Sequence, residues 1–551
     1  MWNGCQPGYF WTFGWLNHGA SSGIDKGGIA AGCAGELSSD LPRCEQTITT
    51  STYFTSSIGL ERNDETMANT YPQIRAAAID ERAHNIYYRQ VQLETLAKAV
   101  IDNTSRISEA IASGYGHSQA EIAVELNLAT TAIRNDYASL QPKKAHEEEY
   151  LLASSKNAAE SRRPAGVVYI EPSTHTLFYS VIVPLSAGIA TGNCVVVLLE
   201  NNLRTLSSLL RDILTKALDR DTFAIASERI TDQDFLELAI HVDQASNDQW
   251  PRANQISSLA STRTVAVVDR TGDVTQAARN LVAARFSFGG RSPYSPDTVF
   301  VNEFVKQEFL QAVVGECVKL GSGVTMNGST KGKPASKVNE QIDSLRKADP
   351  DLRVVLQESK FAVVELTSRN PEVLAQKVEA SVMVVHAFRS LDDVIDTVNS
   401  TGKNVPSLAA YHFSNPASAK YLTQFIEASV TFVNHIPAEI LVGPAFATGR
   451  PVDLAVRYPR ELFQLRRPAF ISNTTTSTAL STALASHNSP AAAKLLAEAS
   501  APLALFKRHP GGGVGFFEQG FLMNAGILLT TTISVSGFTI YWLVKHGKRI
   551  W

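Results

Sequence analysis

Cysteine and excess basic charge are both scarce in this sequence. Its 551 residues include five cysteines, spread from Cys5 to Cys317 without a CxxC pair, so neither a zinc ribbon nor a disulfide framework is predicted. The formal net charge of −3 is the opposite of what phosphate-neutralising proteins carry, and we expect no nucleic-acid partner. Residues 1–30 lack the basic flank and apolar core of a secretory signal. These absences favour a globular protein of a reducing compartment.

The order of periodic segments predicts the fold class. Residues 1–66 are rich in Gly, Ser and Thr without sustained periodicity, which is typical of a poorly ordered extension. Helical spacing follows, with Leu93 and Leu96 on one face. Short β-branched runs such as Val167–Ile170 and Cys194–Leu199 then alternate with helical segments. This alternation predicts an α/β fold built on mostly parallel sheets.

The C-terminal end carries a long uncharged stretch, Gly520–Val544. At ~1.5 Å per residue a helix of this length extends roughly 37 Å, enough to cross a ~30 Å hydrocarbon core. Tyr541 and Trp542 stand where interfacial aromatic residues would, and Lys545 begins a basic flank. A buried core helix is the alternative. We expect a single-pass anchor in a lipid bilayer, with the main domain in the cytosol.

Several motifs follow one another in an order that resembles the aldehyde dehydrogenase superfamily, especially its fatty-aldehyde, class 3-like branch with a membrane tail. They are Arg89-x-x-Gln92, the segment Pro184–Asn193, the loop Gly289–Asp297 (GGRSPYSPD) and Arg460–Phe463. The resemblance covers roughly residues 75–470. It implies a Rossmann-type cofactor domain, an α/β catalytic domain, NAD(P) as cofactor and a hydrophobic aldehyde as ligand. It also implies a homodimer, formed through an arm near Tyr458–Pro468.

The resemblance divides the chain into six expected parts. These are the extension at 1–66, N-terminal helices with a degenerate dinucleotide-binding domain at 67–260, a catalytic-type α/β domain at 261–435, a return segment or oligomerisation arm at 436–471, a linker at 472–519 and a transmembrane helix at 520–544.

The chemical positions of the family are occupied by unsuitable residues. Oxidation of an aldehyde needs a thiolate nucleophile, an amide at the oxyanion, a general base, and a Lys and a Glu on the cofactor ribose. Counted from local motifs, these positions fall on Pro293, His175, Leu259, Leu198 and Ser359, the last beside Glu358 and counted from Phe361. The glycine-containing turn expected near the pyrophosphate falls between Asp243 and Trp250, which contains no glycine. That interval is also short, which indicates the loss of a strand-helix unit.

The joint loss of these positions favours a membrane-anchored pseudoenzyme with a binding or scaffold role, without standard NAD(P)-dependent oxidation. The alternative is an oxidoreductase that converts a fatty or secondary-metabolite aldehyde to its acid. Ser292, with His175 as its base, is then the fallback nucleophile. Cys194 and Cys317 are expected to be core thiols, and no metal site is expected. A decayed gene product is a third possibility, compatible with the composition of residues 1–66.

Overall fold

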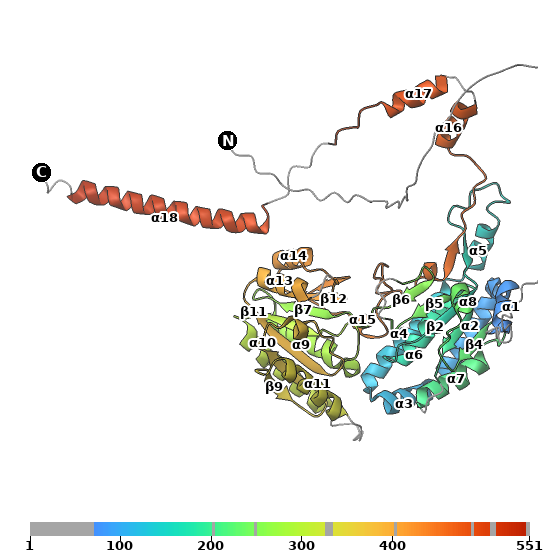
Figure 1. Ribbon diagram of the computed structural model, residues 1–551, viewed down its shortest axis with the longest axis horizontal. Helices are drawn as coiled ribbons and strands as arrows, with labels where there is room; N and C mark the ends of the chain where they lie inside the picture. The colour runs from blue at the N-terminus through green and yellow to red at the C-terminus, as the bar shows by residue number, and fades with distance from the viewer. Residues whose placement is uncertain are drawn as a thin grey trace, which may run out of the picture. The chain divides into compact units, whose positions relative to one another are not determined.

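Two β-sheets organise the described part of the chain, which comprises residues 71–200, 204–246, 251–324, 334–401, 405–485, 490–506 and 514–546 of a computed structural model (Figure 1). The expected extension at 1–66 lies outside the described residues, as do Cys5, Cys33 and Cys44.

The first sheet is wholly parallel and has the strand order β4-β3-β2-β5-β6. Its strands are β2 (Val167–Glu171), β3 (Cys194–Leu198), β4 (Phe223–Ala226), β5 (Ile240–Asp243) and β6 (Gln255–Ser257). The chain starts at the central strand β2, moves outward to β4, and then returns to the other side of β2 for β5 and β6. This reversal makes the gap between β2 and β5 a topological switch point. The predicted Rossmann-type arrangement is confirmed.

Alternation along β2 gives this sheet two buried faces. Val168 and Ile170 contribute to the main core, and Val167 and Tyr169 to a smaller one. Helices α2 (Ile86–Asp102), α3 (Thr104–Tyr115), α4 (Gln119–Ala138), α6 (Leu177–Ala190) and α7 (Thr205–Ala217) contribute side chains to the main core, and α1 (Pro72–Ile79) and α8 (Gln233–Leu238) to the smaller one.

The second sheet has seven strands in the order β13-β12-β7-β8-β11-β10-β9, and only the edge strand β9 is antiparallel to its neighbour. The strands are β7 (Thr264–Val268), β8 (Thr298–Asn302), β9 (Arg353–Gln357), β10 (Ala362–Leu366), β11 (Val382–Phe388), β12 (Ala409–Phe413) and β13 (Thr431–Val433). The helices between them are α9 (Val274–Phe286), α10 (Lys306–Val324), α11 (Pro334–Ala348), α12 (Pro371–Leu374), α13 (Leu391–Thr401) and α14 (Pro416–Phe425). The second α/β domain that the resemblance implied is confirmed as a fold.

One hydrophobic core runs between the two sheets, because side chains of β2, β3, β7, β8 and β12 belong to the same cluster. The chain then returns towards the first sheet. After α15 (Ala438–Leu441), the short strand β14 (Gln464–Arg466) pairs antiparallel with β1 (Arg162–Pro164). Helix α5 (Pro142–Glu149) and the 3-10 turns η1 (Arg82–His84), η2 (Ser287–Gly290) and η3 (Arg460–Leu462) complete this part.

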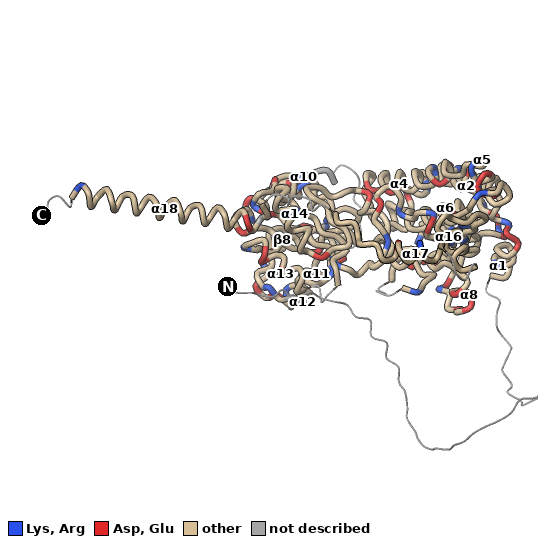
Figure 2. The backbone as a smooth tube through the Cα atoms, turned by 90° about the horizontal axis from the view of Figure 1, so that it is seen from above, with Lys and Arg blue, Asp and Glu red and all other residues tan. Residues whose placement is uncertain are grey.

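The C-terminal segment contains more helix than its composition suggested. Within the stretch expected to be a linker lie α16 (Thr475–Ala485) and α17 (Pro490–Ala499), neither of which has a buried residue. They are followed by α18 (Phe516–His546). By length and composition α18 is the one helix of the described residues able to cross a membrane. Figure 2 shows its backbone free of charged residues along most of its length, with basic residues at the C-terminal end.

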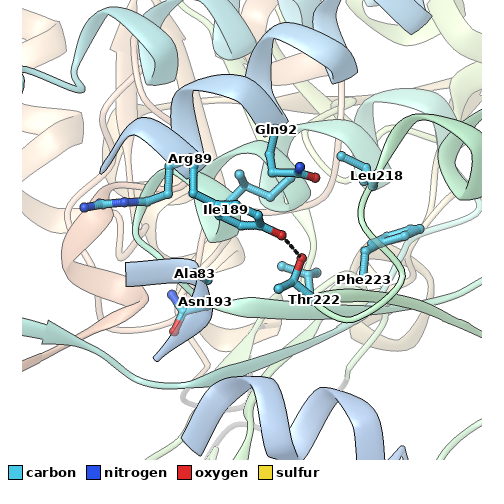
Figure 3. Close-up of a pocket in the computed structure, with 10 residues that line it drawn as sticks. Ala83, Arg89, Gln92, Ile189, Asn193, Leu218, Thr222 and Phe223 are labelled. Carbon is cyan, nitrogen blue, oxygen red and sulfur yellow. Dashed lines mark hydrogen bonds between the residues drawn. The ribbon is translucent and has the colours of Figure 1, made fainter. Parts of the chain in front are cut away.

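The motif Arg89-x-x-Gln92 holds α2 against its neighbours (Figure 3). The Arg89 guanidinium donates to the carbonyl of Ala190 at 2.9 Å, which ties α2 to the end of α6. Gln92 lines a space of about 10 Å³ beside the Tyr88 and Thr222 hydroxyls, which lie 2.8 Å apart. Such a volume holds about one water molecule. The motif is therefore a packing feature and not a ligand site.

Candidate functional site

The loop Gly289–Asp297 leaves η2 and enters β8, and a buried arginine fixes its position. Arg285 is completely buried and donates to the carbonyls of Gly290 at 2.7 Å, Pro296 at 3.2 Å and Val378 at 2.7 Å. Burial lowers the pKa of Arg285 to about 10, so the guanidinium stays charged near neutral pH. Because it joins both ends of the loop to the chain that follows α12, the loop has little freedom to move.

Asp297 supplies the matching negative charge. Its Oδ2 accepts from the Thr264 amide at 2.7 Å and from Lys377 Nζ at 3.0 Å. Its Oδ1 accepts from the Val378 amide at 3.0 Å and lies 3.7 Å from Arg285 Nη1. Asp297 is 1% exposed. The end of the loop is therefore a buried carboxylate shared by two cations and two backbone amides.

Pro293 occupies the nucleophile position with its carbonyl already engaged. That oxygen accepts from Lys377 Nζ at 2.6 Å and from Thr264 Oγ1 at 2.9 Å. Proline offers neither a nucleophile nor a backbone N–H for an oxyanion. Ser292 is buried, and its Oγ accepts from the Tyr294 amide at 3.3 Å.

His175, the fallback base, is not in hydrogen-bond contact with Ser292. Its Nε2 lies 2.9 Å from the Leu441 carbonyl, which can only accept, so the proton is on Nε2. Its Nδ1 is buried without a hydrogen-bond partner. Burial lowers the pKa of His175 to about 3, which keeps the ring neutral. The geometry therefore does not arrange a serine-histidine pair.

A buried pair, His117 and Glu125, lies beside this loop and was not predicted from the sequence. Phe288, in left-handed backbone conformation, presents its ring edge-on to His117 and to His175, at centroid distances of 5.3 and 5.9 Å. His117 Nδ1 lies 3.8 Å from Oε2 of Glu125, whose Oε1 accepts from the Tyr179 amide. The only sequence signal for this pair was Glu125, an acidic residue at a buried position of the amphipathic helix α4.

The switch point, where open α/β sheets form their ligand crevice, is spanned by a glutamine side chain. Gln244, completely buried, accepts from the Ser173 amide at 2.9 Å and donates to the Ser180 carbonyl at 2.8 Å. In doing so it joins the end of β5 to the start of α6, across the place where open α/β sheets bind nucleotides. The described residues 244–246 and 251–254 form no helix between β5 and β6, and residues 247–250 of the expected turn lie outside the described part. The loss of a strand-helix unit at this place stays a prediction.

Charged side chains gather beside this crevice, and the sequence analysis did not select them. Glu171, His241 and Asp243 are all buried, at the carboxyl ends of β2 and β5. Arg229 Nε lies 2.8 Å from Glu171 Oε2, and its Nη2 lies 3.5 Å from Asp243 Oδ2. Burial and the neighbouring Glu171 raise the pKa of Asp243.

The remaining family positions offer no cofactor chemistry. Leu198 packs at the edge of the smaller core, and Leu259 is partly buried after β6. Ser359 and Glu358 are exposed in the turn between β9 and β10, where the Glu358 amide donates to the carbonyl of Phe361. Neither leucine can hydrogen-bond a ribose hydroxyl.

The two described cysteines are core thiols, as predicted. Cys194 and Cys317 are each 1% exposed, and burial raises the pKa of both to about 12. A nucleophilic cysteine needs a lowered pKa and access to a ligand. Neither thiol meets these conditions.

A cavity of about 190 Å³ lies between α4, α6 and the return segment. Its walls include Tyr179, Val183, Ile440 and Phe446. At one side Asp136 accepts from Ser186 Oγ at 2.6 Å, and burial raises the pKa of Asp136 to about 6. The volume is comparable to the ~150 Å³ apolar cavity that takes up benzene.

Comparison with known proteins agrees with this fold. Aldehyde dehydrogenase family 3 member B1 of Homo sapiens is 22% identical over 391 residues, covering 65% of this chain and 81% of that protein. The putative aldehyde dehydrogenase AldX of Bacillus subtilis is 22% identical over 359 residues, covering 60% and 80%. Substrate-bound AldH of Staphylococcus aureus superposes with a TM-score of 0.59 at 16% identity, covering 73% of this chain and 93% of AldH. No protein-family model matches.

The two-sheet architecture with a topological switch point in the first sheet defines an α/β protein with a Rossmann-type parallel sheet. The sequence relatives and structural neighbours together support a relationship of this chain to the aldehyde dehydrogenase superfamily.

Proposed function

We propose that this chain is an aldehyde dehydrogenase-like protein that binds a hydrophobic ligand and does not oxidise aldehydes with NAD(P) by the family's route. The observation that carries this proposal is Gln244, whose buried side chain bridges Ser173 and Ser180 in the switch-point crevice. A dinucleotide would have to displace both hydrogen bonds and leave buried polar groups unpaired, at a cost of about 1–3 kcal/mol for each.

The cavity beside Tyr179 and Phe446 is the proposed ligand site, with a long-chain aldehyde or a related lipid as the class of ligand. In the full chain, we expect a fluorescent long-chain aldehyde analogue to bind, and Ala132→Phe, which fills the cavity wall, to weaken binding at least tenfold. Ala138→Phe, exposed on the same helix, is the matched control. Equal affinity of both variants would place the ligand elsewhere.

The absence of oxidation is tested with the same protein. Calorimetric titration with NAD⁺ and NADP⁺, and absorbance of the reduced cofactor in the presence of a long-chain aldehyde, should both give no signal above buffer. Micromolar cofactor binding together with turnover would establish the alternative function, an oxidoreductase acting on a fatty or secondary-metabolite aldehyde. The aldehyde dehydrogenases among the sequence relatives are the observation that favours this alternative.

We further propose that α18 anchors the chain in a lipid bilayer and leaves the main domain in the cytosol. Its 31 residues and apolar composition support this proposal. Full-length protein should then remain with membranes after alkaline carbonate washing, whereas a chain ending at residue 506 should be released. Release of both forms would rule out a spanning anchor.

A homodimer is the remaining proposal. Leu465 of β14 and the following Phe470 and Ile471 are exposed apolar residues close to the β1–β14 pair, and such residues favour a protein contact. Light scattering of the full chain in detergent should give twice the chain mass after correction for bound detergent. A single chain mass at micromolar concentration would contradict it.

A further inference from the structure

Strand geometry brings three potential metal ligands together at the switch point. Glu171 and Asp243 are register partners on the parallel strands β2 and β5, so their side chains leave the same face of the sheet. His241 lies two residues before Asp243 and therefore shares that face. One ligand atom from each of the three side chains lies within 4.8 Å of the others.

The histidine is aimed into this group without a well-directed hydrogen bond. His241 is 6% exposed, and its buried Nε2 lies 3.1 Å from Glu171 Oε1 without a hydrogen bond between the two atoms. Tyr169 stacks on the imidazole, with ring centroids 5.2 Å apart and planes 21° apart. The ring is thus held in place while its nitrogen still needs a partner.

Arg229 is the only positive side chain that the described ion pairs place on this group. It reaches the cluster from the chain between β4 and α8, and its own side chain is 63% exposed, against 10% for Glu171 and 6% for Asp243. An exposed guanidinium can turn into solvent at little cost, whereas the two carboxylates cannot leave. The carboxylates would then need another cation.

We propose that Glu171, His241 and Asp243 form a binding site for a first-row divalent cation, with Zn²⁺ as the best match, and that Arg229 occupies the site in competition with it. Two carboxylate oxygens and one imidazole nitrogen are ligands of zinc at ~2.0–2.2 Å. Ligand atoms at these bond lengths in a tetrahedron lie roughly 3.4 Å apart. The cluster therefore contracts by on the order of 1 Å on binding, which side-chain rotation provides.

Three protein ligands leave one tetrahedral position for water or a small ligand. The site is separate from the cavity beside Phe446 and from the loop of Pro293, and it does not depend on the proposed absence of oxidation. Its test uses zinc alone, so its failure would leave the proposed function untouched.

The experiment is a zinc titration of chelator-treated full-length protein, followed by competition with a chromophoric chelator. We expect one zinc per chain. His241→Gln and Glu171→Gln should weaken binding at least a hundredfold, while Arg229→Gln should strengthen it about tenfold. Arg369→Gln, which removes the arginine of another ion pair, with Asp393, is the matched control and should bind like the unaltered chain.

The Arg229→Gln result separates a cation site from a structural ion-pair cluster. In a purely structural cluster, loss of Arg229 lowers the melting temperature and leaves zinc affinity unchanged, and that outcome would overturn the proposal. So would undiminished binding by His241→Gln, since the zinc would then be held elsewhere. If His241→Gln or Glu171→Gln does not fold, Arg229→Gln and the absorption spectrum of the Co²⁺-loaded unaltered chain remain as the test. Co²⁺ bound by these three ligands should absorb as a four- or five-coordinate ion, and an octahedral spectrum would contradict the site.

Discussion

Asp297 is the residue whose replacement tests the description of the loop most directly. The substitution Asp297→Asn keeps the size of the side chain and removes its charge, leaving the buried Arg285 and the partly buried Lys377 without their counter-ion. It also turns an amide N–H₂ towards donors, since all the groups that Asp297 accepts from are N–H groups. Breaking a buried ion pair by removing one partner costs about 3–5 kcal/mol. We expect a loss of that size in the free energy of unfolding.

The assay is urea unfolding of the full chain in mild detergent, followed by circular dichroism, with midpoints compared at unchanged slope. Asp393→Asn is the matched control. Asp393 also pairs with an arginine, at 2.6 Å, but the side chain of that partner, Arg369, is 52% exposed. Exposed pairs contribute about 0–1 kcal/mol. If the two substitutions shift the midpoint equally, the loop is not held by a buried charge network.

Three further predictions concern the chemistry of the loop, the pH dependence set by Asp136 and the backbone at Gly290. The double variant Pro293→Cys, His175→Asn should still form no NADH from a long-chain aldehyde, because Leu259 and Leu198 remain at the positions of the general base and of the ribose-binding lysine; measurable turnover would refute this. Burial raises the pKa of Asp136 to about 6 from 3.8, so the folded state binds more protons between these values. The free energy of unfolding should then fall by at most about 3 kcal/mol as pH rises from about 4 to 6, and Asp136→Asn should flatten this profile. Gly290→Ala should lower the melting temperature, because its φ is +68° and the added Cβ would lie 2.6 Å from a facing carbonyl oxygen; Gly315→Ala, in an open helical position, should raise it slightly.

Local pattern was sufficient to predict most of the sheet architecture. The run Val167–Ile170 was predicted as a strand and forms most of β2, Val167–Glu171, which is buried throughout, because uninterrupted apolar, largely β-branched residues fit a strand buried on both faces. The helical spacing that begins at Leu93 and Leu96 gave no sign that α2 would end before Asn103 and α3 begin after it. There Asn103 Nδ2 donates to Ala99 and the Thr104 hydroxyl to Val100, and such side-chain bonds compete with the helix backbone.

From the sequence, the site could be predicted only as a set of family positions that hold unsuitable residues. Motif spacing indicated that Pro293 stands at the nucleophile position, but not that its carbonyl would be bound by Lys377, which lies 84 residues away. Likewise the absence of glycine after Asp243 was visible, whereas the placement of Gln244 in the crevice depends on how β5 meets α6. Contacts of this kind arise from strand order and register, which no local pattern specifies.

The buried loop network also bears on whether Ser292 can act as a substitute nucleophile. To meet a base, Ser292 would have to move together with the adjacent Pro293. The loop would then have to release the contacts that Lys377 makes with Pro293 and Asp297. Breaking that network costs about 3–5 kcal/mol. At about 1.4 kcal/mol for each factor of ten, the rearranged loop would be populated roughly 10²- to 10⁴-fold less than the observed one. Any serine chemistry would be slowed by the same factor, in addition to the weak basicity of His175, whose pKa burial lowers to about 3. The loop is therefore better suited to tying β7 and β8 to the chain that follows α12 than to presenting a nucleophile.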